Sequence, residues 1–295
     1  MGQHSTGSEM AQTAHKGLKR LSGKPARNQT GSNMTDERLT QIERMFRIGT
    51  DLAEKVVAKA QNLTASDAEE YAYKGAMFFF FCKAYKSYQG ARLLFREGFP
   101  KDAFVLARTI FEISLQAQYM QEDPKPRARL FVEHDPVARY RYYEQLKKIG
   151  DTSLAPAIEI RKEELVALKE HHDRLQGRYP KGKGWWGNSI AWLAKHLGKN
   201  MEMRYAAIYW MQSNLVHTGA ASIKDYLDEQ KDGLKVNCYA ASSNDVMGPQ
   251  EATLFFLNIT RLTSEALALD LSTEVGKAFA EFQEIVTPAS EASVR

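Results

Sequence analysis

The chain has 295 residues, of which 43% are hydrophobic and 26% charged, an ordinary composition for a soluble globular protein with a sizeable core. Its net charge of +4 comes from residues 1–34, which hold five lysines and arginines against one acid, so that residues 35–295 are neutral. A neutral body argues against a large, dedicated nucleic-acid surface, although a local basic patch can be hidden in a balanced total.

The cysteine spacing and the hydropathy argue against a metal protein and a membrane protein. Cys82 and Cys238 form no CxxC pair and have no metal-ligand spacing, so we expect neither a metal site nor a cofactor. The longest apolar run, Ala76 to Cys82, is seven residues long, whereas a transmembrane helix needs about 20. We therefore expect a cytoplasmic protein with no transmembrane span.

The first 34 residues are rich in Gly, Ser, Gln, Asn and Thr and predict a disordered basic arm. Apolar residues then recur at helical spacing almost to the end of the chain, which predicts one all-α domain over 35–288, a single bundle of about eight or nine helices. The expected helices cover residues 35–62, 66–97, 103–121, 127–149 with a break or bend near Asp135-Pro136, 155–176, 189–197, 201–217 and, as one helix or two, 250–285. Between the last two, a short strand pair around Val236 to Tyr239 is one of two interpretations, and an ordered loop is the other.

The segment Ala103 to Gln121 predicts the central helix, because it is apolar on nearly every face. Apart from Tyr119, its ionisable residues are Arg108 and Glu112, which are four residues apart and should be partly buried and paired. One interpretation is a structural ion pair, whose disruption would cost about 3–5 kcal/mol if it were fully buried. The other is a guanidinium left partly unpaired, which faces a pocket and binds an anion such as a phosphate or a carboxylate.

His217 is the second candidate, near the end of a helix that carries Tyr209, Ser213 and Asn214. A single histidine on an apolar face is more often a core residue than a catalyst. If His217 lies near Arg108 and Glu112, however, these three would form the centre of an internal polar pocket. Tyr119, Ser213, Asn214, Trp186 and Tyr209 are the candidate binding residues around it.

Several short motifs in order resemble a known family. They are Leu93-Leu94 with Gly98, Ala107 to Glu112 with Tyr119, Arg127 to Phe131, Trp186 with Ser189-Ile190, and Tyr209 with Ser213 to His217. Over roughly residues 70–240 the chain resembles the bacterial domain of unknown function 5677. The resemblance implies an all-helical fold with no established activity, and a setting in bacterial defence or stress response.

That family is distantly similar to HEPN domains, some of which are metal-independent ribonucleases with an Arg-x4-6-His motif. Here the nearest arginine before His217 is Arg204, thirteen residues upstream, so Arg108 from another helix would have to replace the missing arginine. Two functions are therefore expected. The first is a helical binding or regulatory module for an unknown protein or a small anionic ligand. The alternative is a ribonuclease in which His217 is the general acid/base and Arg108 stabilises phosphate charge. RNA is a partner in the second case, and a homodimer is compatible with both.

Overall fold

The computed structural model describes residues 36–62, 64–150, 152–153, 160–216, 227–230, 233–236 and 247–287. Residues 1–34, for which a disordered arm is expected, lie outside the described residues, and residues 34–295 form one unit by their internal contacts. The described residues form nine α-helices, one 3-10 turn and one small hairpin, so the all-α class is confirmed. None of the described helices has the length and hydropathy needed to cross a membrane.

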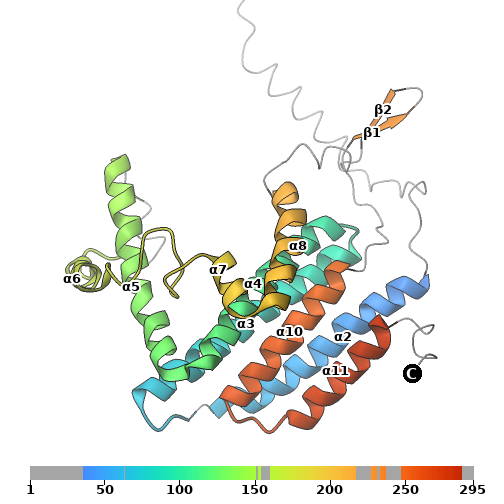
Figure 1. Ribbon diagram of the computed structural model, residues 1–295, viewed down its shortest axis with the longest axis horizontal. Coiled ribbons are helices and arrows are strands. Elements are labelled where there is room, and N and C mark those ends of the chain that lie inside the picture. The colour runs from blue at the N-terminus through green and yellow to red at the C-terminus, as the bar shows by residue number, and fades with distance from the viewer. Residues whose placement is uncertain are drawn as a thin grey trace, which may run out of the picture. The chain divides into compact units, whose positions relative to one another are not determined.

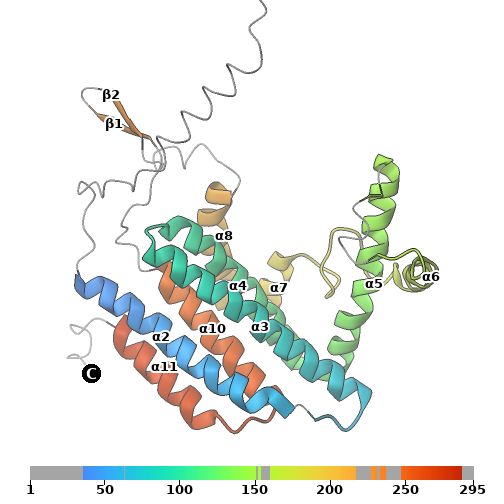
Figure 2. The ribbon, with the colours of Figure 1, turned by 180° about the vertical axis from the view of Figure 1, so that it is seen from behind.

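Five helices make the main core: α2 (Asp36–Lys59, continued by the 3-10 turn Ala60–Asn62), α3 (Ala68–Arg96), α4 (Pro100–Glu122), α10 (Met247–Ala266) and α11 (Ser272–Val286). α4 packs against α3 and α10, α10 also packs against α2 and α3, and α11 closes against α2 and α10 (Figures 1 and 2). The local sequence begins these helices as expected. The side chain of Asp67 accepts from the Glu70 N–H at the start of α3, and Pro100 occupies the first turn of α4.

α4 is enclosed along nearly its whole length. No residue from Ala103 to Gln121 is exposed, and α5, α7 and α8 cover the parts of α4 that α3 and α10 leave open. The predicted central position of this helix is therefore confirmed. Any polar group on α4 must be satisfied by one of these neighbours or face a gap between them.

The remaining elements are α5 (Pro124–Ile149), α6 (Leu165–Leu175), α7 (Ile190–His196), α8 (Lys199–Val216) and the antiparallel strands β1 (Leu227–Gln230) and β2 (Gly233–Val236), which pair Leu227 with Val236. The start of α5 packs on α3, and its later turns contact α6. Two small apolar clusters, separate from the main core, hold α5 and α6 together around Tyr140 and Tyr179.

The structure corrects three expectations about element boundaries. α5 runs through Pro136 without a break. The proline removes only one backbone donor, and the buried Val137 and Tyr140 anchor the turns that follow it. Residues 160 and 161 are not helical, residues 162–164 form a turn, and α6 begins at Leu165 rather than at 155. The strands of the hairpin, 227–230 and 233–236, reach the first residue of the segment for which a strand pair or a loop is expected, and residues 237–239 of that segment lie outside the described residues. α10 begins at Met247 and carries Pro249 in its first turn.

Candidate functional site

Arg108 and Glu112 form the expected ion pair on α4. The Arg108 Nε donates to the Glu112 Oε1 at 2.8 Å, and the two side chains are 20% and 33% exposed. The predicted pairing is confirmed, but the burial is partial. Because water still reaches both groups, we expect the loss of one partner to cost about 1–2 kcal/mol, well below the cost for a fully buried pair.

Two stacked tyrosines of α8 lie beside this ion pair. The Arg108 Cζ lies 4.4 Å from the centre of the Tyr209 ring, and Tyr205 stacks on Tyr209 with ring centres 5.1 Å apart. Burial raises the pKa of the Tyr205 hydroxyl, Tyr209 and Glu112 raise it further, and Arg108 opposes them. Tyr205 is therefore neutral at physiological pH and keeps a proton to donate. We call Arg108, Glu112, Tyr205 and Tyr209 the Arg108 cluster.

The guanidinium of the Arg108 cluster has unused hydrogen-bonding capacity. Within the described part of the chain, its hydrogen bond is the one from Nε to Glu112, and its terminal nitrogens have no partner. Stacking on Tyr209 holds the plane of the guanidinium while leaving those edge donors available. The arrangement can therefore accept an anion with two oxygens in the guanidinium plane.

A second ion pair holds α8 in place. The Arg204 Nη1 donates to both carboxylate oxygens of Glu251 on α10, at 2.7 and 2.8 Å, and the Arg204 Cζ lies 5.6 Å from the centre of the Phe255 ring. The Glu251 side chain is 20% exposed, and its burial raises the pKa of the carboxyl while Arg204 opposes the shift. The sequence did not identify this pair, because 47 residues separate its partners and local spacing contains no signal for such a contact.

Tyr119 belongs to a different cluster. It lies eleven residues after Arg108, about 16 Å along the helix. The Cζ of Arg127 stacks 3.7 Å from the centre of its ring, and Trp192 and His196 of α7 meet the ring edge to face. The structure therefore does not bring Tyr119 together with Arg108, contrary to the prediction of one shared pocket.

Glu122 joins the ends of α4, α5 and α7 next to Tyr119. It accepts from the Arg127 Nη1 at 2.6 Å and pairs with the His196 Nε2 at 2.9 Å. Burial acts to raise the pKa of Glu122, but the hydrogen bonds from Arg127 and His196 outweigh it, so that the pKa is lowered. Arg127 also donates to the backbone carbonyl of Tyr119, in the last turn of α4. These contacts are typical of a structural junction, where cations meet the negative end of a helix.

Trp185 packs beside Tyr119 and hydrogen-bonds to α4. Its indole Nε1 donates to Gln116 of α4 at 2.9 Å, and its ring lies 5.6 Å from the ring of Tyr119. Trp186, predicted as a binding residue, stands edge to face against Trp185 and donates from Nε1 to the backbone carbonyl of Ser189. Trp186 therefore belongs to the Tyr119 side of the molecule and not to the Arg108 cluster.

Three of the predicted site residues cannot be placed beside Arg108. His217 lies outside the described residues. Ser213 and Asn214 are part of the backbone of α8, but their side chains lie outside the described part of the chain. Their proximity to Arg108 remains a prediction. Of the predicted site residues, the structure brings together Arg108, Glu112 and Tyr209, and it adds Tyr205, whose spacing of four residues from Tyr209 was the available signal.

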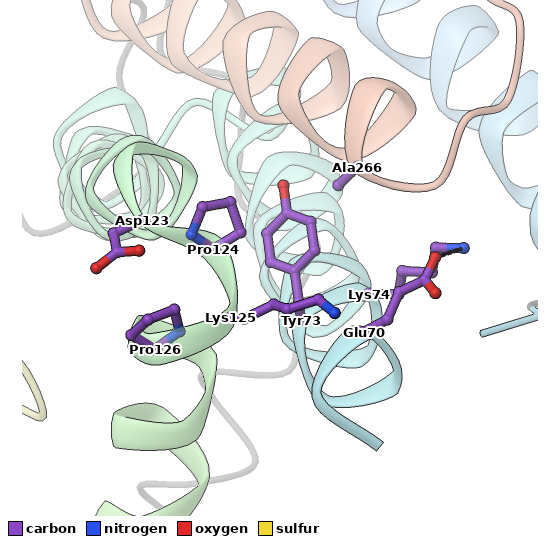
Figure 3. Close-up of a pocket in the computed structure, with 8 residues that line it drawn as sticks. All are labelled: Glu70, Tyr73, Lys74, Asp123, Pro124, Lys125, Pro126 and Ala266. Atoms are coloured by element: carbon purple, nitrogen blue, oxygen red, sulfur yellow. Dashed lines mark ion pairs between the residues drawn. The ribbon is translucent and has the colours of Figure 1, made fainter. Parts of the chain in front are cut away.

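A surface pocket of about 500 Å³ lies elsewhere, where the start of α3, the start of α5 and the end of α10 meet (Figure 3). Tyr73 stands at its centre with Pro124 beside it, and burial together with Glu265 raises the pKa of Tyr73 to about 12. Its lysines are already neutralised, Lys74 by Glu70 and Lys125 by Asp67, each at 2.7 Å. The pocket therefore presents no free charge from lysine to a ligand, and it contains none of the predicted site residues.

Among the residues that the structure describes, no three His, Cys, Asp or Glu side chains are grouped closely enough to hold a metal ion.

The fold and the Arg108 cluster define an all-helical protein whose enclosed central helix carries one partly exposed arginine beside two stacked tyrosines. The chain belongs to a family of unknown function, DUF5677, whose match covers residues 74–234. That range includes both the Arg108 cluster and the Tyr119 side. No curated protein and no solved structure matches the chain. The resemblance to this family is therefore confirmed, whereas the similarity to HEPN domains remains a prediction.

Proposed function

We propose that this protein is a helical binding module and that the Arg108 cluster binds an anionic group, a phosphate or a carboxylate. The proposal depends on how the guanidinium of Arg108 is held. Arg108 is held by Glu112 through Nε and by the Tyr209 ring, while its terminal nitrogens are unpartnered within the described residues. An arginine held in this way is preorganised for a ligand, because little conformational freedom is lost when the ligand binds.

The charge around the guanidinium supports an anion over a cation. Glu112 balances part of the positive charge, and burial keeps the neighbouring Tyr205 hydroxyl neutral, so among the described residues no second anion pairs with the terminal nitrogens of Arg108. The Tyr209 ring excludes water from one face of the guanidinium, which strengthens the electrostatic attraction at its edge. A bidentate oxyanion matches this geometry better than a single-atom ion does.

Binding at Arg108 predicts a specific response to substitution. The melting temperature of the wild-type protein should rise with millimolar inorganic phosphate or citrate at constant ionic strength, because a ligand of the folded state stabilises it. Arg108→Gln should abolish the rise. Arg108→Lys should keep a smaller rise, with an affinity for the anion about tenfold weaker, since a lysine lacks the planar guanidinium. Differential scanning fluorimetry against a chloride series measures both effects.

Arg261→Gln is the matched control. Arg261 and Glu265 form another pair four residues apart, at 2.7 Å, but on a more exposed part of α10. This variant should respond to phosphate and citrate as the wild type does. A response unchanged in Arg108→Gln, or lost equally in Arg261→Gln, would refute anion binding at Arg108.

The alternative function is a metal-independent ribonuclease with His217 as general acid/base. The observation in its favour is the same free edge of Arg108, which can contact a phosphate in a transition state as well as in a bound ligand. Incubation with structured RNA in excess chelator tests it. Cleavage by the wild type that is lost in folded His217→Ala supports a ribonuclease, and absence of cleavage by both refutes it.

The biological setting of the proposal comes from the family resemblance. It implies a regulatory role in bacterial defence or stress response, in which the anion is a small ligand or a group on a partner. A homodimer is compatible with that role.

A further inference from the structure

One stretch of the chain combines cations and aromatic rings without any acid. Between Asp173 and Glu202 there are six lysines and arginines and no aspartate or glutamate. The same stretch carries Trp185, Trp186 and Trp192. Interleaved basic and aromatic residues are the pattern of surfaces that bind single-stranded nucleic acids, where lysines contact phosphates and bases stack on rings.

The structure exposes these cations. All six are on the surface, in the last turn of α6, the loop 176–189, α7 and the first residue of α8. Arg178 pairs with Glu133, and Arg174 contacts His171. The other four have no acidic partner within the described ranges and are Lys181, Lys183, Lys195 and Lys199. Their charges are therefore available to an external anion.

The aromatic side chains of this stretch form an ordered base for such a surface. Trp192 is 37% exposed and stacks on His196, with ring centres 4.9 Å apart and planes within 18°. Trp185 is buried and anchors the loop to α4 through Gln116. The contact with His196 thus restricts the Trp192 ring, and a restricted ring loses little conformational entropy when a base stacks on it.

The loop between α6 and α7 is also held in shape. The Gly184 N–H donates to the Asn188 carbonyl and the Gly187 N–H to the Gly184 carbonyl. The Trp186 ring packs on Gly184, and a Cβ added there would lie 2.3 Å from the ring unless the ring moved. Lys181 and Lys183 therefore extend from a closed turn, and their positions relative to Trp186 are set by the backbone.

The residues around this stretch also carry a positive net charge. Residues 124–200 hold 16 lysines and arginines against nine aspartates and glutamates, so the rest of the body, 35–123 and 201–295, is net acidic. The neutral total of residues 35–295 conceals a strong separation of charge along the chain. A separation of this kind steers a polyanion toward one part of the protein.

We propose that the exposed surface made by Lys181, Lys183, Trp192, Lys195 and Lys199 binds a single-stranded nucleic acid, with the lysines on its phosphates and a base stacked on Trp192. Stacking requires an unpaired base, because the faces of bases inside a duplex are covered by their neighbours. The surface is distinct from the Arg108 cluster and does not depend on anion binding there.

Fluorescence anisotropy with labelled oligo(U), oligo(dT) and duplex DNA of about 20 nucleotides or base pairs, longer than a typical single-strand site, tests the proposal. Chelator is present throughout, so that binding is measured without metal-dependent cleavage by contaminants. The wild type should bind at least one single strand more tightly than the duplex. Trp192→Ala should weaken that binding about tenfold, and Trp192→Phe should restore most of it.

The quadruple variant K181Q/K183Q/K195Q/K199Q removes the phosphate contacts. The slope of log affinity against log salt should fall by about 3, because each contact with a single strand contributes about 0.7. The control K55Q/K83Q/K86Q/K277Q makes the same change in net charge with exposed lysines of α2, α3 and α11. It should leave the slope and the affinity within about twofold of the wild type.

Four results would overturn the proposal: no binding of either single strand, equal or tighter binding of the duplex, equal losses in the two quadruple variants, or unchanged binding in both Trp192→Ala and the loop quadruple. Trp192→Ala should keep the rise in melting temperature that phosphate produces in the wild type, whereas Arg108→Gln should lose it. Failure of anion binding at Arg108 is therefore distinguishable from failure of this surface.

Discussion

The Gly49→Ala substitution should lower the free energy of unfolding by about 3 kcal/mol, a large share of the stability of a typical domain. Gly49 lies in α2 opposite Tyr88 of α3, and an added Cβ would come within 2.6 Å of the Tyr88 Cε1 and hydroxyl oxygen. Tyr88 cannot retreat, because it is fully buried and its hydroxyl donates to the Met45 carbonyl at 3.0 Å and also contacts Thr253. Overpacking of this kind forces α2 away from α3.

Gly75→Ala is the matched control for the effect of the methyl group. Gly75 lies inside α3, and an added Cβ meets nothing within 4 Å there. Because alanine is the better helix former, this variant should be more stable by up to about 1 kcal/mol. Chemical denaturation followed by circular dichroism measures both variants.

A double variant separates the clash from other causes. In the Tyr88→Leu background the ring is absent, so Gly49→Ala should then change the free energy of unfolding by less than about 1 kcal/mol. A full loss of about 3 kcal/mol in that background would show that the tight contact between Gly49 and Tyr88 is not the cause.

Breaking the ion pair between Arg204 and Glu251 has the second large effect. Arg204→Met should lower the free energy of unfolding by about 2 kcal/mol at neutral pH, because Glu251 is left mostly buried without its cation. The estimate is below that for a fully buried pair, since both side chains keep some exposure. The variant should also loosen α8, and with it the position of Tyr209 beside Arg108.

The pH dependence of this pair has a definite sign. The folded-state pKa of Glu251 is raised by burial, so the folded protein binds its proton more tightly than the unfolded chain does. The resulting stabilisation is present below the ordinary carboxyl pKa, about 4, and is lost as pH rises through the folded pKa. The stability of the wild type relative to Glu251→Gln should therefore fall as the pH rises from about 4 toward neutrality.

Urea denaturation of the wild type, Arg204→Met and Glu251→Gln across that pH range measures these differences. The loss in Arg204→Met should shrink at acidic pH, because a protonated Glu251 no longer needs a cation. A loss that is the same at both ends of the range would contradict the assigned role of Glu251. Acidic residues elsewhere, such as Glu70 with its pKa lowered to about 2, affect all three proteins equally and cancel in the comparison.

The candidate site was predictable in part. The pairing of Arg108 with Glu112 follows from a spacing of four residues, which places two side chains on one face of any helix. The stacking of Arg108 on Tyr209 does not, because it depends on how α8 crosses α4. Tyr119 was assigned to the same pocket by its position on the same helix, but three helical turns separate it from Arg108.

Local chemistry in the chain determined that it is helical, the approximate bounds of α3 and α4, and the central place of α4. Apolar spacing, capping residues such as Asp67 and stop signals such as Gly98-Phe99-Pro100 act over a few residues and need no partner. The tertiary structure decided which distant groups meet. The pairs Arg204 with Glu251, Gly49 with Tyr88 and Gln116 with Trp185 each join separate segments of the chain. Contacts of this kind depend on packing angles between helices, and those angles arise from many side chains acting together.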